Sequence, residues 1–115
     1  IPVLTLDEKY WHNNKFHGTM VIELNDKQIG RLDTASGMHF DFAQLIAHTA
    51  KTRELGKGTL IGSGTVSSHE PKDGFGCLLE RNVVSGDDTY MKSGDRIKMY
   101  IEEFKDSLII NQKVL

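Results

Sequence analysis

The sequence is poor in several features, and each shortage excludes a class of protein. Its 115 residues contain one cysteine, Cys77, so no disulfide forms within the chain, and a reducing compartment such as the cytoplasm is expected. No apolar run approaches the roughly 20 residues that a membrane-spanning helix needs, so we expect no membrane partner. A formal net charge of −2 gives no field that attracts nucleic acid.

The residues that are present fit one folded domain over residues 1–115. Hydrophobic residues make up 38% and charged residues 26% of the chain, which is typical of a globular protein and not of a disordered one. The length is that of a single domain with a modest core. The first residue is Ile1, not Met, which suggests a processed or trimmed chain.

An alternating pattern near the N-terminus predicts a β-hairpin. Apolar and polar residues alternate over residues 18–24, and three apolar side chains share one face: Met20, Ile22 and Leu24. A period of two is typical of a half-buried strand. Asn25 and Asp26 form a turn signal, so residues 28–33 are expected to return as the second strand.

A second alternating pattern predicts a hairpin at the C-terminal end. Ile97, Met99 and Ile101 alternate with polar or amphipathic residues. Lys105 and Asp106 then turn the chain into residues 108–114. One face of this hairpin is expected to be buried.

Only residues 38–53 show a helical period. Apolar or small side chains recur on one helical face at Met38, Phe42, Leu45, Ile46 and Thr49. Ser36 or Asp41 is expected at the N-terminus of this helix, and Gly56 near its C-terminal end. Residues 59–66 and 77–84 are expected to be strands. The chain therefore predicts an α+β fold, mostly β, with one main helix.

Two short segments are candidates for chemistry. Gly62, Ser63, Gly64 and Thr65 follow an apolar run, and glycines let backbone amides approach an anion or a developing oxyanion. This segment has no lysine and no helix pattern after it, so it is not a nucleotide phosphate loop. Spacing alone favours a simple strand bend. Glu80 lies in an otherwise apolar stretch, either on a solvated edge or in a site where its charge matters.

The histidines form no recognised metal motif. His39 and His48 lie nine residues apart, so they cannot bind one metal from the same helical face. His12, His17 and the His69–Glu70 pair show no ligand spacing either. Cys77 is expected to be a small core residue. Spacing therefore predicts no metal ligands in this chain.

Four motifs resemble the fumarylacetoacetate hydrolase family, in that family's order. The helix sequence FDFAQLIAHTAKT and the strand-and-glycine sequence LGKGTLIGSGT come first, followed by FGCLLE and YMKSGDR. Together they cover roughly residues 38–103. The resemblance implies the C-terminal portion of a mixed β-sandwich or roll, often dimeric, with Mg²⁺ or Ca²⁺ in the complete enzyme. It also implies hydrolysis of a carbon–carbon bond in β-diketo or oxo acids, as in aromatic amino acid catabolism.

The resemblance assigns roles to three residues and leaves others unfilled. Thr65, with Gly64, corresponds to the substrate-binding threonine region, and Glu80 to the catalytic carboxylate that orients a base histidine. The family's Glu-x-Glu metal ligands, ligand aspartates, base histidine and lysine lie upstream of this region, and this chain contains no Glu-x-Glu. No cofactor is therefore expected for this chain alone.

Two hypotheses stay open at this point. The chain is either the C-terminal segment of such an enzyme, inactive by itself, or a non-catalytic remnant or dimerisation module of the same fold. In both cases a homodimer is expected, because strands without their upstream partners expose apolar faces. The faces expected at its interface are those of Met20, Ile22 and Leu24 and of Ile97, Met99 and Ile101.

Overall fold

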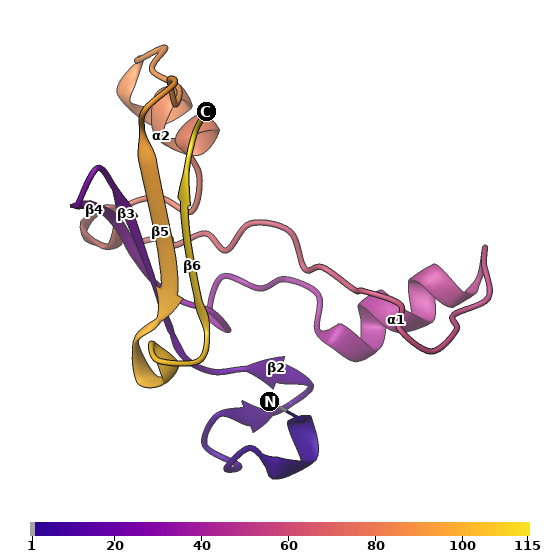
Figure 1. Ribbon diagram of the computed structural model, residues 1–115. Helices are drawn as coiled ribbons and strands as arrows, with labels where there is room; N and C mark the ends of the chain where they lie inside the picture. The colour runs from indigo at the N-terminus through magenta and orange to yellow at the C-terminus, as the bar shows by residue number, and fades with distance from the viewer. Residues whose placement is uncertain (1) are drawn as a thin grey trace.

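The computed structural model describes residues 2–115 and has the expected α+β architecture, mostly β (Figure 1). One sheet has two strands, and the other has four in the order β4-β3-β5-β6. The strands are β1 (Trp11–His12), β2 (Lys15–Phe16), β3 (Thr19–Leu24), β4 (Lys27–Asp33), β5 (Arg96–Ile101) and β6 (Ile109–Lys113). The helices are α1 (Phe42–Ala50) and α2 (Leu78–Ser85), with 3-10 turns η1 (Val3–Thr5), η2 (Pro71–Asp73) and η3 (Glu102–Phe104).

The strand pairing of both predicted hairpins is confirmed, but the buried face predicted for the C-terminal hairpin is wrong for β6, all of whose residues are exposed. Strands β3 and β4 pair antiparallel, and the turn between them places Asn25 and Asp26 at φ 51° and 62°. This left-handed pair is what a two-residue hairpin turn requires. Strands β5 and β6 also pair antiparallel, with η3 in the connection. A second turn of the same left-handed kind, at Asn13 and Asn14, joins β1 to β2.

The sheet centre holds the buried core. Leu32 is fully buried, and Val21 and Ile22 are 2% exposed. Strand β3 lies between β4 and β5, so both of its edges are paired. The prediction that Ile22 belongs to an exposed apolar face is wrong, because its side chain is already buried within the monomer. No helix among residues 2–115 is long and apolar enough to cross a membrane.

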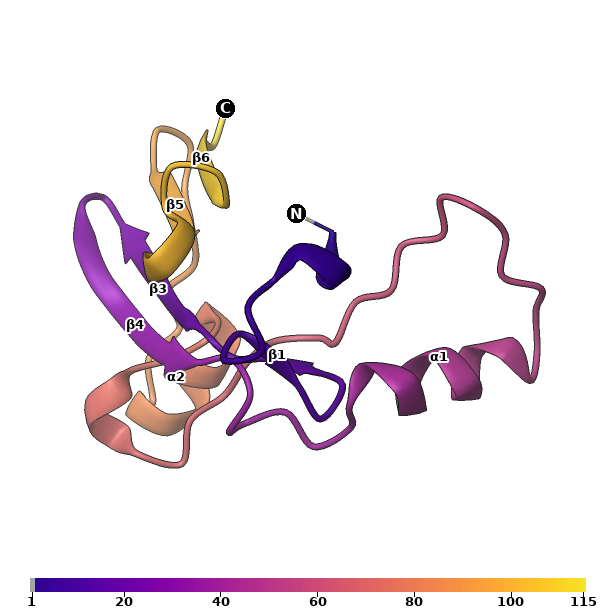
Figure 2. The ribbon, with the colours of Figure 1, turned by 90° about the horizontal axis from the view of Figure 1, so that it is seen from below.

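The predicted helix exists but is shorter than residues 38–53. Asp41 caps α1, since its side chain accepts from the Gln44 N–H at 2.8 Å and the Gln44 side chain accepts from the Asp41 N–H at 3.0 Å. This reciprocal capping box confirms Asp41 as the start. Gly56 is not the cap: the helix ends at Lys51, whose N–H bonds the His48 carbonyl. Figures 1 and 2 show α1 standing apart from the four-stranded sheet.

Two strand predictions are wrong. Residues 59–66 form no strand and belong to the long connection that returns from α1 (Figure 2). The segment predicted as a strand over residues 77–84 is mostly helix α2. Cys77 caps this helix through its Sγ, and Gly86 ends it in the left-handed conformation at φ 75°. These two caps set the helix by local bonds that the apolar pattern did not reveal.

Candidate functional site

The glycine-flanked segment lies in an irregular, exposed connection. Gly64 has φ 82°, a conformation that favours glycine, and a Cβ there would meet no other atom within 4 Å. Glycine is therefore favoured at position 64 by the positive φ angle, and not because a side chain would collide with a neighbour. Thr65 is exposed, and its hydroxyl forms no hydrogen bond to other groups in residues 2–115. The backbone at Gly64 and the Thr65 hydroxyl are therefore both accessible to a ligand.

Glu80 lies in the first turn of α2, partly buried. Its Oε2 accepts the Gly76 N–H at 3.2 Å, while its own N–H donates to the Cys77 Sγ at 3.4 Å. A carboxylate is favoured at a helix N-terminus, where backbone N–H groups carry partial positive charge. Within residues 2–115 this bond uses one carboxylate oxygen, which leaves Oε1 for another donor.

A close backbone contact links the two predicted site segments. A Cβ added to Gly76 would lie 1.9 Å from the Val66 carbonyl oxygen, so only a glycine permits this approach. Val66 follows Thr65 in the chain, and Gly76 donates to Glu80. The structure thus brings the segments of Thr65 and Glu80 together, although it shows no direct contact between these two side chains.

A second glycine supports the same segment from the other side. A Cβ on Gly37 would lie 1.8 Å from the Ser67 carbonyl oxygen. Residues 66 and 67 are therefore held between Gly37 and Gly76 by backbone contacts. This packing fixes where the chain that carries Thr65 runs, without regular secondary structure.

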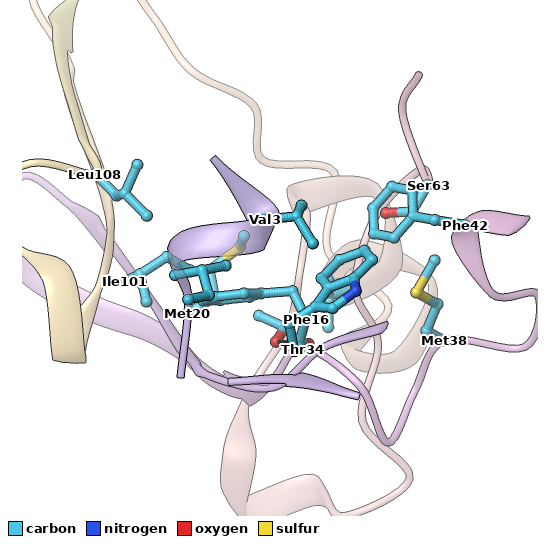
Figure 3. A pocket seen from close by; sticks show the side chains of 12 residues that line it. Val3, Phe16, Met20, Thr34, Met38, Phe42, Ser63, Ile101 and Leu108 are labelled. Atoms are coloured by element: carbon cyan, nitrogen blue, oxygen red, sulfur yellow. Dashed lines mark hydrogen bonds between the residues drawn. The ribbon is translucent and has the colours of Figure 1, made fainter. Parts of the chain in front are cut away.

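An apolar cavity of about 330 Å³ opens beside this segment (Figure 3). Ser63 and Val66, which flank Gly64 and Thr65, form part of its wall. In Figure 3, Ser63 lies near Phe42, with Ile101 and Leu108 on the opposite side. Sequence reasoning did not find this cavity, because its walls come from parts of the chain far apart in sequence.

Aromatic side chains from the N-terminal hairpin form much of that wall. The Trp11 and Phe42 rings pack with centroids 5.8 Å apart, and Phe16 lies on the adjacent strand. The only sequence signal was the presence of two aromatics, Trp11 and Phe16, in a segment otherwise polar. The hairpin turn at residues 13–14 is what brings them onto one side.

A separate polar cavity is lined in part by the start of β3 and the end of β4. Glu103 closes it by accepting from the Thr19 N–H and hydroxyl, both at 2.9 Å. Partial burial acts to raise the pKa of Glu103, but these hydrogen bonds outweigh it and hold the pKa below its ordinary value. His17, which also lines this cavity, stacks on His12 at 3.5 Å.

The described residues form no metal centre. No group of three or more His, Cys, Asp or Glu side chains within residues 2–115 is placed to hold an ion. A hard cation such as Mg²⁺ needs several convergent oxygens. The donor set of the described residues therefore does not fit a Mg²⁺ or Ca²⁺ ion.

Comparison with known proteins gives one family. The family model described as fumarylacetoacetate (FAA) hydrolase C-terminal matches residues 7–108. No curated protein matches the chain. The matched region includes Gly64, Thr65 and Glu80, strands β1 to β5 and both helices, and it ends just before β6.

Proposed function

Because this chain belongs to the fumarylacetoacetate hydrolase family, we propose that it is the C-terminal segment of a metal-dependent hydrolase. The substrate class is a β-diketo or related oxo acid, in which the enzyme cleaves a carbon–carbon bond. By itself the chain is inactive, since the family's metal ligands and base histidine are not among its motifs. In the complete enzyme a metal ion held by upstream residues would polarise the substrate's carbonyl oxygens.

The contact between Val66 and Gly76 carries this proposal. It supports a shared site for Thr65 and Glu80, which are 15 residues apart in the sequence and lie on an irregular segment and a helix respectively. A fold without this site has no evident need for two backbones so close that a single methyl group would collide with a carbonyl oxygen. Close backbone approach of this kind is costly unless glycine is kept.

Glu80 orients the base. Its Oε2 is held by the Gly76 N–H, which fixes the carboxylate, and Oε1 is left to accept the N–H of a histidine from another part of the enzyme. Such a bond selects the histidine tautomer whose other nitrogen removes a proton from water, and it stabilises the resulting cation. The water oxygen adds to the substrate carbonyl carbon. The bond to the neighbouring carbon then breaks, with its electron pair leaving as an enolate that takes up a proton.

Thr65 and Gly64 bind the substrate's oxygens. The free Thr65 hydroxyl donates a hydrogen bond, and the positive φ of Gly64 turns the backbone beside it. Donors placed at the oxygen where negative charge develops are effective in a site that excludes water. The adjoining apolar cavity gives such exclusion on one side.

The large exposed surface of the chain supports a homodimer. The accessible surface is 8404 Å², whereas a compact monomer of this mass exposes about 6300 Å². The radius of gyration is 15.7 Å, against about 13 Å for a compact chain of this length. In a homodimer the second copy of the chain would bury the accessible surface that exceeds that of a compact monomer. The single free cysteine, Cys77, suits a cytoplasmic enzyme.

A non-catalytic remnant or dimerisation module is the second candidate. The observation that favours it is the bond from Gly76 to Glu80, which a purely structural role at the start of α2 also explains. In that case the family fold is kept while the reaction is lost. The two candidates differ in whether Oε1 of Glu80 has a catalytic partner.

Turnover decides between them. The gene is read upstream of Ile1 for an in-frame Glu-x-Glu segment, and the joined protein is assayed on acylpyruvates as wild type, Glu80→Gln and Glu70→Gln. We expect Glu80→Gln to lower kcat by about 10²- to 10⁴-fold and to shift the pH–rate profile, because the base loses its orienting partner. Glu70, exposed before η2, is the matched control and leaves kcat unchanged. Unchanged kcat in Glu80→Gln, or an upstream gene without these ligands, favours the remnant.

A further inference from the structure

The cavity beside the Thr65 segment is apolar over nearly its whole wall. Trp11, Phe16, Phe42 and Met20 line it, and none of its lining residues is charged. Its volume of about 330 Å³ falls in the range of small-molecule pockets. An apolar cavity of about 150 Å³ already takes up benzene, so this one has room for a phenyl ring and a few further carbons.

Only two hydroxyl groups belong to the wall, those of Thr34 and Ser63. The Thr34 hydroxyl is already engaged, since it donates to the Phe16 carbonyl at 2.7 Å and accepts from the Gly18 N–H at 3.0 Å. Ser63 carries the other hydroxyl of the wall, which makes only a long, 3.3 Å bond to the adjacent Gly64 carbonyl. The one hydroxyl of the wall that is still available therefore lies next to Gly64 and Thr65. The Trp11 indole N–H is a further polar group, on an otherwise apolar ring.

This division gives the cavity a polar end and an apolar body. In Figure 3, Ser63 lies on the side of Phe42, and Val3, Met20, Ile101 and Leu108 extend the apolar wall away from it. A carboxylate placed in that body would lose its water without gaining a positive partner, which is strongly unfavourable. An uncharged hydrocarbon group gains from the same burial.

Building on the proposed function, we propose that the substrate is an oxo acid with an uncharged apolar tail, aromatic or branched aliphatic. Its oxo-acid end lies at Ser63, Gly64 and Thr65, and its tail fills the cavity between the Trp11 hairpin and the end of the four-stranded sheet. A substrate whose tail ends in a second carboxylate is excluded from this position. The cavity thus discriminates between substrates by their tails, whereas Thr65 binds the oxo-acid end that all substrates of the class share.

The test uses the 115-residue chain and binding, not turnover. Trp11 is the only tryptophan, so its indole N–H gives a single identifiable NMR signal at the cavity wall. Three acylpyruvates are titrated that differ only in the tail: phenyl, methyl and carboxymethyl. We expect the phenyl compound to shift the Trp11 signal with at least about 10-fold higher affinity than the methyl compound, and the carboxymethyl compound to bind least.

A pair of neighbouring variants serves as the control. Val3 lines the cavity and is 43% exposed, whereas Leu4, the next residue of η1, is 98% exposed and does not line it. Val3→Asp is expected to weaken phenyl binding by about 10-fold or more, and Leu4→Asp to leave it unchanged. Both add the same charge at nearly the same place, so their difference reports the cavity.

The outcomes separate this inference from the proposed function. Equal affinity for phenyl and methyl tails, preference for the carboxymethyl tail, or equal effects of the two variants overturns the apolar-tail specificity. Absence of any shift in the Trp11 signal overturns it as well. None of these binding results depends on whether Glu80→Gln lowers turnover, and that measurement tests the proposed function independently.

Discussion

The central strands β3 and β4 and the two helices differ in how far their apolar side chains are buried. In the sheet, Leu32 is fully buried between β4 and the chain that covers it, near Gly76. On the helices, Ile46 of α1 is 45% exposed and Val83 of α2 is 77% exposed. The centre of the sheet, around β3 and β4, is thus a core that the chain closes by itself. The edge strand β6 is not part of it, since Ile109 and Ile110 are each 46% exposed. Each helix likewise presents an apolar surface without a covering element in residues 2–115.

This difference shows where the chain is complete and where it needs a partner. The sheet is held by strand pairing between β3, β4, β5 and β6. By contrast, α1 is attached chiefly at its N-terminal end, where the Phe42 N–H bonds the Asn14 carbonyl and its ring meets Trp11. A nine-residue helix is only marginally stable without tertiary packing. We therefore expect association to involve the helices more than the sheet centre.

The largest expected effect concerns assembly. Light scattering at micromolar concentration is expected to give twice the monomer mass, because the exposed apolar surface exceeds that of a compact monomer. Val83→Glu places a charge on the exposed face of α2 and is expected to favour the monomer. Lys105→Glu alters the net charge more but adds no charge to that face, and it is the control. A folded wild-type monomer at all concentrations would contradict the proposed homodimer.

The next effect compares one core residue with one helix residue. Leu32→Ala is expected to lower the free energy of unfolding by about 3–4 kcal/mol, because it removes buried methyl groups and leaves a cavity. Ile46→Ala, at a half-exposed position on α1, is expected to lower it by less than about 1 kcal/mol. Urea unfolding followed by circular dichroism measures both.

If Leu32→Ala prevents folding, a more conservative substitution at the same position replaces it. Leu32→Met keeps most of the volume and is expected to cost less than about 1.5 kcal/mol. Equal destabilisation by Leu32→Ala and Ile46→Ala would show that α1 is packed as firmly as the sheet. The contrast between the two regions would then be wrong.

The smallest effect tests the segment between the two regions. Gly76→Ala is expected to lower the free energy of unfolding by about 1–3 kcal/mol, since the added methyl group collides with the Val66 carbonyl. Gly62→Ala, where a Cβ would meet no atom within 4 Å, is expected to be neutral or to stabilise by less than about 1 kcal/mol. Thermal unfolding of the two variants gives the comparison, and equal melting temperatures would mean that the Val66–Gly76 approach is not maintained in solution.

Features that depend on neighbouring residues were predictable. The turn at Asn25 and Asp26, the cap at Asp41 and the alternation around Met99 each involve residues a few positions apart. Their energies are set by local hydrogen bonds and by which face a side chain occupies. The family motifs likewise indicate Thr65 and Glu80 as candidate site residues, although nothing local indicates that their segments meet.

The sequence by itself therefore determined the two hairpins of the large sheet, the position of α1 and the family. The tertiary structure decided the pairing of β3 with β5, the helical state of α2 and the apolar cavity next to Thr65. The reason is physical: β3 and β5 are separated by some 70 residues, and the cavity wall joins the start, middle and end of the chain. Contacts of that range depend on how the whole chain packs, and no pattern within a short window records them.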